Sequence, residues 1–287
     1  MKGLFSGLEK FGLQLEDDIT VFDEEKKKVK NEAGESVAVE LREEDLLIDR
    51  IVKCPICEKK FKTKSVKSGK IKALESDKDL RPRYKELDVN KYGVKLCTNC
   101  GYAALDKFFV ALPPAQEKLV KEQISSKFDA SDYDKECDIY SYDMAIERYK
   151  LALLNSIVKK ARVSERAYTC LKTAWVIRGK SENLSKDSSN YEELKMQLRK
   201  EEDTFLKNAL EGFYKAASTE GFPMCGMDES MVDYIIAVLA MRFKKYDLAS
   251  RVLSNLLISK NTNRRIKDRA YDLKEELITM MKVDKSK

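Results

Sequence analysis

The chain has 287 residues, of which 43% are hydrophobic and 36% are charged, a composition typical of a globular protein with room for two domains. It contains no histidine, which excludes Ser-His-Asp and Cys-His catalysis and a His-ligated catalytic zinc. The net charge of +6 is uneven, because residues 1–50 carry −6, residues 51–110 carry +8 and the remainder carries +4. The basic middle segment predicts an acidic protein partner, a nucleic-acid partner, or lysines that offset nearby thiolates.

The sequence carries no signal for a membrane or for secretion. The longest uninterrupted apolar run, Tyr234–Met241, covers eight residues, which are too few to span a bilayer. Leu4, Phe5, Leu8 and Phe11 predict one short apolar helical face, but this stretch is too short for a secretory signal. We expect this face to pack on the protein, and we expect a cytoplasmic location.

Two cysteine pairs follow the acidic N-terminal segment. Cys54 and Cys57 form the first pair and Cys97 and Cys100 the second, and the two-residue gap in each pair lets both sulfurs bind one ion. Redox dithiols are the alternative, but two such pairs in one segment favour a shared metal. We therefore predict one structural Zn²⁺ ion. The remaining three cysteines are isolated in the sequence and indicate no disulfide framework, which fits a reducing compartment: Cys137, Cys170 and Cys225.

The segment between the cysteine pairs is 39 residues long, enough for two hairpins. We predict a hairpin leaving the first pair, made from Phe61–Val66 and 70–74, and a strand at 92–96 that enters the second pair. Seven lysines fall between residues 59 and 72, either as the exposed face of this ribbon or as a nucleic-acid contact. Gly101 follows the second pair and accepts a positive φ, whereas Glu58 predicts a different or strained turn after the first.

The rest of the chain predicts helices. Pro114 opens a helix that runs to about Ser126, and residues 111–140 form a linker with this short helix. From residue 141 onward, apolar residues recur at helical spacing, with one helix expected from Ser164 to Gly179 and another capped by Asp228. Small and aromatic residues at recurring positions in 233–256 resemble a degenerate tetratricopeptide repeat.

These patterns predict an α+β protein in three parts. Residues 1–110 hold an N-terminal segment and a small β-rich, zinc-ribbon-like domain with four cysteine ligands. Residues 111–140 form the linker, and residues 141–287 form an all-α, helical-repeat-like bundle.

Several motifs together resemble the bacterial family known as domain of unknown function 2225. They extend over most of the chain and are Lys53-Cys54-Pro55-Ile56-Cys57, Leu96-Cys97-Thr98-Asn99-Cys100-Gly101-Tyr102-Ala103, Arg148-Tyr149-Lys150-Leu151-Ala152, Phe222-Pro223-Met224-Cys225-Gly226-Met227-Asp228-Glu229 and Arg264-Arg265-Ile266-Lys267-Asp268. The resemblance implies a bacterial cytosolic zinc protein with a helical second half, and it implies no substrate.

Two further features are candidate sites. Cys225 precedes the helix capped by Asp228, where a helix N-terminus favours a reactive thiolate, although a packed loop cysteine is the simpler interpretation. The last helix begins with a cluster of cations that opposes the helix dipole, and either Asp268 and Asp272 or an acidic partner offsets them. The cations of this cluster are Arg264, Arg265, Lys267 and Arg269.

We interpret the chain as a non-enzymatic zinc-containing interaction protein whose helical surface binds a protein or peptide partner. The alternative is a nucleic-acid-binding protein that uses the lysine-rich ribbon, which demands a steep dependence of affinity on salt. A thiol- or carboxylate-based enzyme is the third reading. No membrane contact and no small-molecule substrate are indicated.

Overall fold

The computed structural model describes residues 29–30, 36–37, 42–129, 137–187 and 189–285. The short helical face predicted at Leu4–Phe11 lies outside these residues. Contacts divide the chain into two units, 1–41 and 42–287. In the first, the antiparallel strands β1 (Val29–Lys30) and β2 (Ser36–Val37) pair with each other.

Two antiparallel hairpins form the ribbon of the second unit. Strand β3 (Leu47–Lys53) pairs with β4 (Lys60–Val66), and β5 (Val94–Leu96) pairs with β6 (Ala103–Leu105). The partner of β4 is therefore β3 and not residues 70–74 as we predicted. Strand β3 is long enough to pair with β4 in full, with Leu47 opposite Val66 and Lys53 opposite Lys60, so the first cysteine pair lies in the turn between them.

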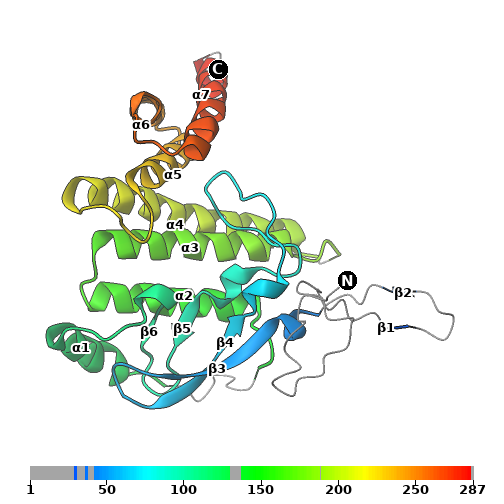
Figure 1. Cartoon of the computed structure of the whole chain (residues 1–287), viewed down its shortest axis with the longest axis vertical. Coiled ribbons are helices and arrows are strands. Elements are labelled where there is room, and N and C mark those ends of the chain that lie inside the picture. Colours follow the sequence, from blue (N-terminus) through cyan, green and yellow to red (C-terminus); the bar gives the residue numbers. More distant parts are fainter. Residues whose placement is uncertain (1–28, 31–35, 38–41, 130–136, 188, 286–287) are drawn as a thin grey trace, which may run out of the picture. The chain divides into compact units, whose positions relative to one another are not determined.

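Seven α-helices follow the ribbon among the described residues, which confirms the α+β class. Their bounds are α1 (Pro114–Val120), followed by a π-helical turn (Lys121–Ser125), α2 (Tyr142–Val158), α3 (Val163–Glu182), α4 (Tyr191–Thr219), α5 (Glu229–Arg242), α6 (Tyr246–Ile258) and α7 (Arg264–Lys285). Helices α2, α3 and α4 run alongside one another, with the ribbon on the α2 side and α5 beyond α4 (Figure 1).

Local sequence explains where these helices begin. Ser141 and Asp228 each accept a hydrogen bond from a backbone amide three residues later, which caps α2 and α5. Helix α3 starts at Val163, before the predicted cap Ser164, and it continues past Gly179 to Glu182. A Cβ at residue 179 would lie 2.5 Å from a carboxylate oxygen of Asp88, so this glycine permits close packing and does not end the helix.

Two apolar cores hold the layers together. The larger one contains residues of all five helices from α3 through α7, among them Trp175, Phe213, Ile235 and Leu256. The second joins the β5–β6 hairpin to α2 and α3, so one half of the ribbon shares a core with the helices. No helix among the described residues combines the length and the apolar character that a bilayer-spanning segment needs.

A long connection between the two hairpins reaches the helices. Residues 71–87, which we call the strap, are drawn back on themselves by the Leu74 N–H to Arg83 carbonyl bond of 2.8 Å and the Lys85 N–H to Lys72 carbonyl bond of 3.0 Å. The strap, cyan in Figure 1, extends from the ribbon across α3 and α4 toward α5 and α7. The 39 residues between the cysteine pairs thus connect the ribbon to the helical part.

Candidate metal centre

The two cysteine pairs lie in turns of the same backbone form. In the first knuckle (residues 54–58) the Glu58 amide donates to the Cys54 carbonyl at 3.0 Å, and in the second (residues 97–101) the Gly101 amide donates to the Cys97 carbonyl at 2.9 Å. The amides of Cys54 and Cys97 each donate to a carbonyl five residues later, at 2.9 Å. The two turns are local repeats of one structure.

For Glu58 we expected either a different backbone geometry or a strained turn, and the structure shows the strained turn, with the left-handed backbone also found at Gly101. The φ of Glu58 is +58°, and the φ of Gly101 is +73°. The first turn therefore closes with the same geometry as the second, and it does so with a side chain that costs on the order of 1–2 kcal/mol in this region.

The four cysteine sulfur atoms lie close together in one cluster. The Cys54 and Cys100 sulfurs are 3.6 Å apart, as are those of Cys57 and Cys97, and all four lie within 4.8 Å of one another. A metal–sulfur bond of 2.3 Å in a tetrahedron places the sulfurs about 3.8 Å apart. The cluster therefore has the size of a four-thiolate metal site, and these residues could hold one ion.

The ionisation of the thiols also fits a cation. Hydrogen bonds with Cys54 and Cys97, together with burial, raise the pKa of Cys100, because they disfavour its charged form. Hydrogen bonds from Cys100 and Cys54 lower the pKa of Cys97. Thiols this close cannot all ionise unless a cation offsets their charges, and a bound divalent ion supplies that charge.

A small apolar core surrounds the cluster. Cys54, Cys97 and Cys100 are buried in it with apolar residues of the ribbon, and Val120 of α1 and Ile124 of the π-helical turn belong to the same cluster. The ribbon residues are Ile56, Phe61, Tyr102 and Phe109. Asn155 of α2 donates a side-chain hydrogen bond of 3.0 Å to the Gly101 carbonyl, which attaches the second knuckle to the helices.

Cys225 lies apart from this centre, in the connection between α4 and α5. Burial raises the pKa of its thiol to about 11. The Lys107 side chain donates a hydrogen bond to the backbone carbonyl of Cys225. A high pKa keeps the thiol neutral, which weakens the case for a reactive cysteine, and that role stays a prediction.

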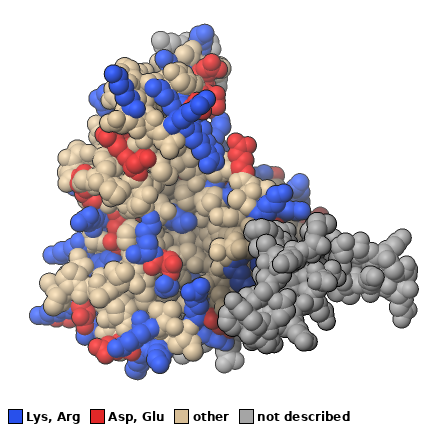
Figure 2. Space-filling view, viewed as in Figure 1, with Lys and Arg blue, Asp and Glu red and all other residues tan. Residues whose placement is uncertain are grey.

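The predicted basic cluster lies on the first two turns of α7, where Arg264 and Arg265 are exposed. Arg269 has a different setting, because its guanidinium donates to the Ser76 hydroxyl at 2.8 Å and to the Asp77 carbonyl at 3.4 Å, both in the strap. Figure 2 shows lysine and arginine side chains gathered over the end of the molecule that α6 and α7 form. A role in partner binding stays a prediction for these residues.

A buried ion-pair network attaches the strap to the helices. Arg178 of α3 bonds to Asp77 at 3.1 Å, to Asp79 at 2.6 Å and to Glu202 of α4 at 2.8 Å. Arg81 of the strap bonds to Asp77 at 2.7 Å and to Glu182 at 2.6 Å. Although burial opposes its charge, the Asp79 and Glu202 carboxylates hold the pKa of Arg178 above its usual range.

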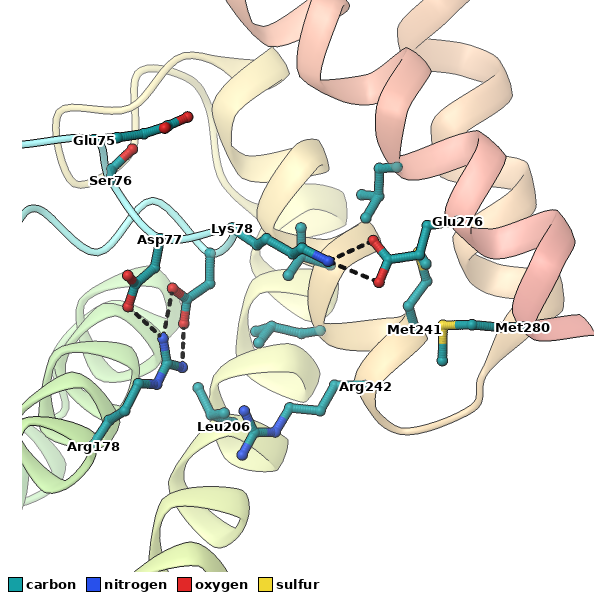
Figure 3. Close-up of a pocket in the computed structure, with 14 residues that line it drawn as sticks. Glu75, Ser76, Asp77, Lys78, Arg178, Leu206, Met241, Arg242, Glu276 and Met280 are labelled. Atoms are coloured by element: carbon teal, nitrogen blue, oxygen red, sulfur yellow. Dashed lines mark hydrogen bonds and ion pairs between the residues drawn. The ribbon is translucent and has the colours of Figure 1, made fainter. Parts of the chain in front are cut away.

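We did not predict this network from the sequence. The strap reads as a polar connection, and the only local signal is the close succession of Asp77, Asp79, Arg81 and Arg83. Figure 3 shows Arg178 pointing at Asp77, and Lys78 reaching across to Glu276 of α7, with a nitrogen–oxygen distance of 2.7 Å. The strap and helices α3, α4, α5 and α7 line a hollow of about 680 Å³ that we call the central groove.

The comparisons with known proteins identify one family. The family model described as an uncharacterized protein conserved in bacteria (DUF2225) matches residues 47–277. No curated protein and no solved structure matches the chain. The matched range includes both knuckles, the strap and helices α1 to α6.

Proposed function

Because the chain belongs to the bacterial DUF2225 family, whose description names no reaction, we propose its function from the site and its surroundings. We propose that it is a non-enzymatic interaction protein with one structural zinc ion. The ion, bound by Cys54, Cys57, Cys97 and Cys100, holds the ribbon together. The helical part and the strap bind a protein or peptide partner.

The four-sulfur cluster is the observation that carries the metal part of this proposal. Four thiolates fill a tetrahedral coordination sphere, so the ion has no open position for a substrate or an activated water. Zinc is the usual ion in such closed sites, where its binding free energy contributes to folding. The role of the ion is thus to stabilise the fold.

Open, partly apolar hollows beside the helices support the binding part. The central groove has a floor of Leu206, Leu239 and Leu273 and a rim of charged residues from the strap and α7. Helical layers that leave such a groove suit a peptide segment, because apolar side chains provide the affinity and the charged rim selects the partner.

The nucleic-acid alternative depends on the lysines of the ribbon. Lys62 and Lys64 both pair with Asp49, at 2.9 Å each, and Lys53 pairs with Glu58 at 3.1 Å. These pairs reduce the charge that the β3–β4 hairpin offers to phosphates. The alternative stays a prediction, and the experiment below tests it.

The experiment has a metal arm and a partner arm. Elemental analysis of purified protein is expected to give one zinc per chain, and none for Cys97→Ser; iron in place of zinc would give a coloured protein and correct the choice of ion. A tagged chain is expected to capture a protein partner from the native cell, and capture should survive nuclease treatment. Loss of capture after nuclease would favour the nucleic-acid reading, and metal-free wild-type protein would contradict the zinc assignment.

A further inference from the structure

A second hollow lies between the strap and the first turns of α7. It has a volume of about 370 Å³, and we call it the basic pocket. The side chains that matter for its chemistry are Leu74, Arg83, Met231, Arg265, Ile266 and Arg269. It thus combines residues of the strap, α5 and α7, which are far apart in the sequence.

The basic pocket differs from the central groove in charge. Three arginines and no carboxylate line the basic pocket, whereas Glu75, Asp77, Asp79 and Glu276 all line the central groove. A pocket whose charged walls are all cationic raises the local concentration of anions, and it disfavours a basic ligand.

The arginines differ in how far their charge is already offset. Arg83 bonds to Asp77 at 3.1 Å and to Glu182 at 3.4 Å, so its charge has partners within the chain. Among the described residues, the hydrogen bonds of Arg269 go to uncharged groups, which are the Ser76 hydroxyl and Asp77 carbonyl of the strap and the Tyr234 side chain of α5. Within that same part of the chain, the Arg265 guanidinium forms no ion pair and its side chain is exposed. Two positive charges therefore face the pocket without a carboxylate.

The position on α7 adds to this imbalance. The first turn of α7 contains no acidic residue, so Arg265 stands at the positive end of the helix dipole without an anion beside it. The expected contribution of Asp268 does not take the form of an ion pair to Arg264 or Arg265 among the described residues. An anionic ligand at this place would offset both the dipole and the arginines.

The floor of the pocket is apolar. Leu74 of the strap is 48% exposed and lies at the pocket with Met231 of α5 and Ile266 of α7. A ligand that covers these side chains removes apolar surface from water, at about 25 cal/mol per Å². A bare anion could not use this surface, but a peptide with an apolar side chain next to its carboxylates could.

We propose that the basic pocket binds an acidic peptide segment of a protein partner, with its carboxylates at Arg265 and Arg269 and one apolar side chain against Leu74 and Met231. This inference rests on the function proposed above and specifies the chemistry of the partner.

Three labelled octapeptide pools test it with the full-length, zinc-loaded protein. The first combines acidic positions with one leucine, the second replaces the acidic residues by lysine, and the third replaces the leucine by serine. We expect the first pool to bind best by fluorescence anisotropy and to shift the methyl resonances of Leu74, Met231 and Ile266. The lysine pool should not bind, and the serine pool should bind about tenfold more weakly.

Two variants distinguish a specific effect of the pocket arginine on binding from a general effect of the protein's charge. Arg265→Glu should weaken binding of the acidic pool at least about tenfold, while Lys274→Glu, with the same charge change at an exposed position of the same helix outside the pocket lining, should stay within about twofold. Circular dichroism checks that both variants are folded.

The proposal is overturned if both variants weaken binding equally, if no pool binds at millimolar concentration, or if a single-stranded oligonucleotide binds this pocket and the acidic pool does not. Its failure differs from failure of the proposed function: a partner that Arg265→Glu still captures from the cell contradicts only the pocket. The absence of any nuclease-resistant partner contradicts the interaction function itself.

Discussion

The β5–β6 hairpin buries all of β6 and packs Val94 and Leu96 into the core of α2 and α3, whereas the β3–β4 hairpin leaves Ile48 44% and Ile51 76% exposed. Both hairpins supply two sulfurs in the same local geometry. The difference indicates that two hairpins can each supply two sulfurs to one site although only one of them is packed into the core of α2 and α3. The first hairpin buries Phe61 and Leu47 only in smaller clusters outside the core of α2 and α3, so we expect its position to depend on a bound ion more than that of the second hairpin.

Removing the metal should separate the two hairpins most strongly. Structural zinc contributes on the order of 10–16 kcal/mol in small peptides, so chelation should lower amide-exchange protection in β3 and β4 by at least about a thousandfold. The amides of β5 and β6 should keep most of their protection, and helical circular dichroism should persist. Equal loss in both hairpins would contradict the comparison, and re-addition of zinc is the control for reversibility.

Adding a methyl group at Gly101 should damage the better supported knuckle. A Cβ there would lie 2.5 Å from the Phe128 ring, and the φ of +73° disfavours any side chain. We expect Gly101→Ala to lower the free energy of unfolding by about 2–4 kcal/mol, measured by urea denaturation with saturating zinc. Gly69→Ala, where no atom lies within 4 Å of the new Cβ, is the control and should cost much less.

Cutting the hydrogen bond between α2 and the second knuckle should have a smaller effect. Asn155→Ala removes the 3.0 Å bond to the Gly101 carbonyl and leaves that buried oxygen without its side-chain donor. We expect a loss of about 1–3 kcal/mol in the same denaturation experiment. Asn208→Ala removes a similar side-chain bond to an exposed helical carbonyl, that of Thr204, and should change stability by much less. A similar cost for both variants would mean that this bond does not hold the ribbon.

Relieving the strained turn of the first knuckle should produce the smallest change, and a gain. Glu58→Gly removes the cost of a left-handed backbone at a residue with a side chain, about 1–2 kcal/mol. It also increases the conformational entropy of the unfolded chain, which lowers the free energy of unfolding by about 0.5–1 kcal/mol. We expect a net stabilisation of about 0.5–1 kcal/mol. Glu58→Ala also loses the exposed pair with Lys53 but keeps the strained backbone, so it should not stabilise. Equal stability of the two variants would argue against strain at residue 58.

The sequence allowed the clustering of four cysteines that could hold a metal ion, and most helices, to be predicted because these depend on local patterns. The two-residue spacing of Cys54 and Cys57, and of Cys97 and Cys100, was sufficient to predict that the four sulfurs lie together. The caps Ser141 and Asp228, and helical spacing of apolar residues, located the helices to within a few residues. The α+β class and the family were predicted correctly for the same reason.

The strap could not be predicted, because it depends on contacts between distant residues. Asp79 bonds to Trp175 and to Arg178, nearly one hundred positions later, and no local pattern links them. The partner of β4 was predicted wrongly for another reason: the segments before and after β4 are both close to it in the sequence, and the local pattern does not select between them. A lone Gly179 suggested a helix end, while its role is to admit Asp88 against α3. The division into domains at residues 110 and 140 stays a prediction.

The strap lies between the two cysteine pairs in sequence, yet Lys78 and Ser76 contact Glu276 and Arg269 near the other end of the chain. During synthesis from the N-terminus, both cysteine pairs leave the ribosome long before α7 is made. An ion could therefore bind to the four cysteines early. Its binding would close the loop that contains the strap and so restrict the conformations that the strap samples before it contacts α7. The contacts with α7 can form only after translation of that helix, so they are the late step that joins the first and last parts of residues 42–287.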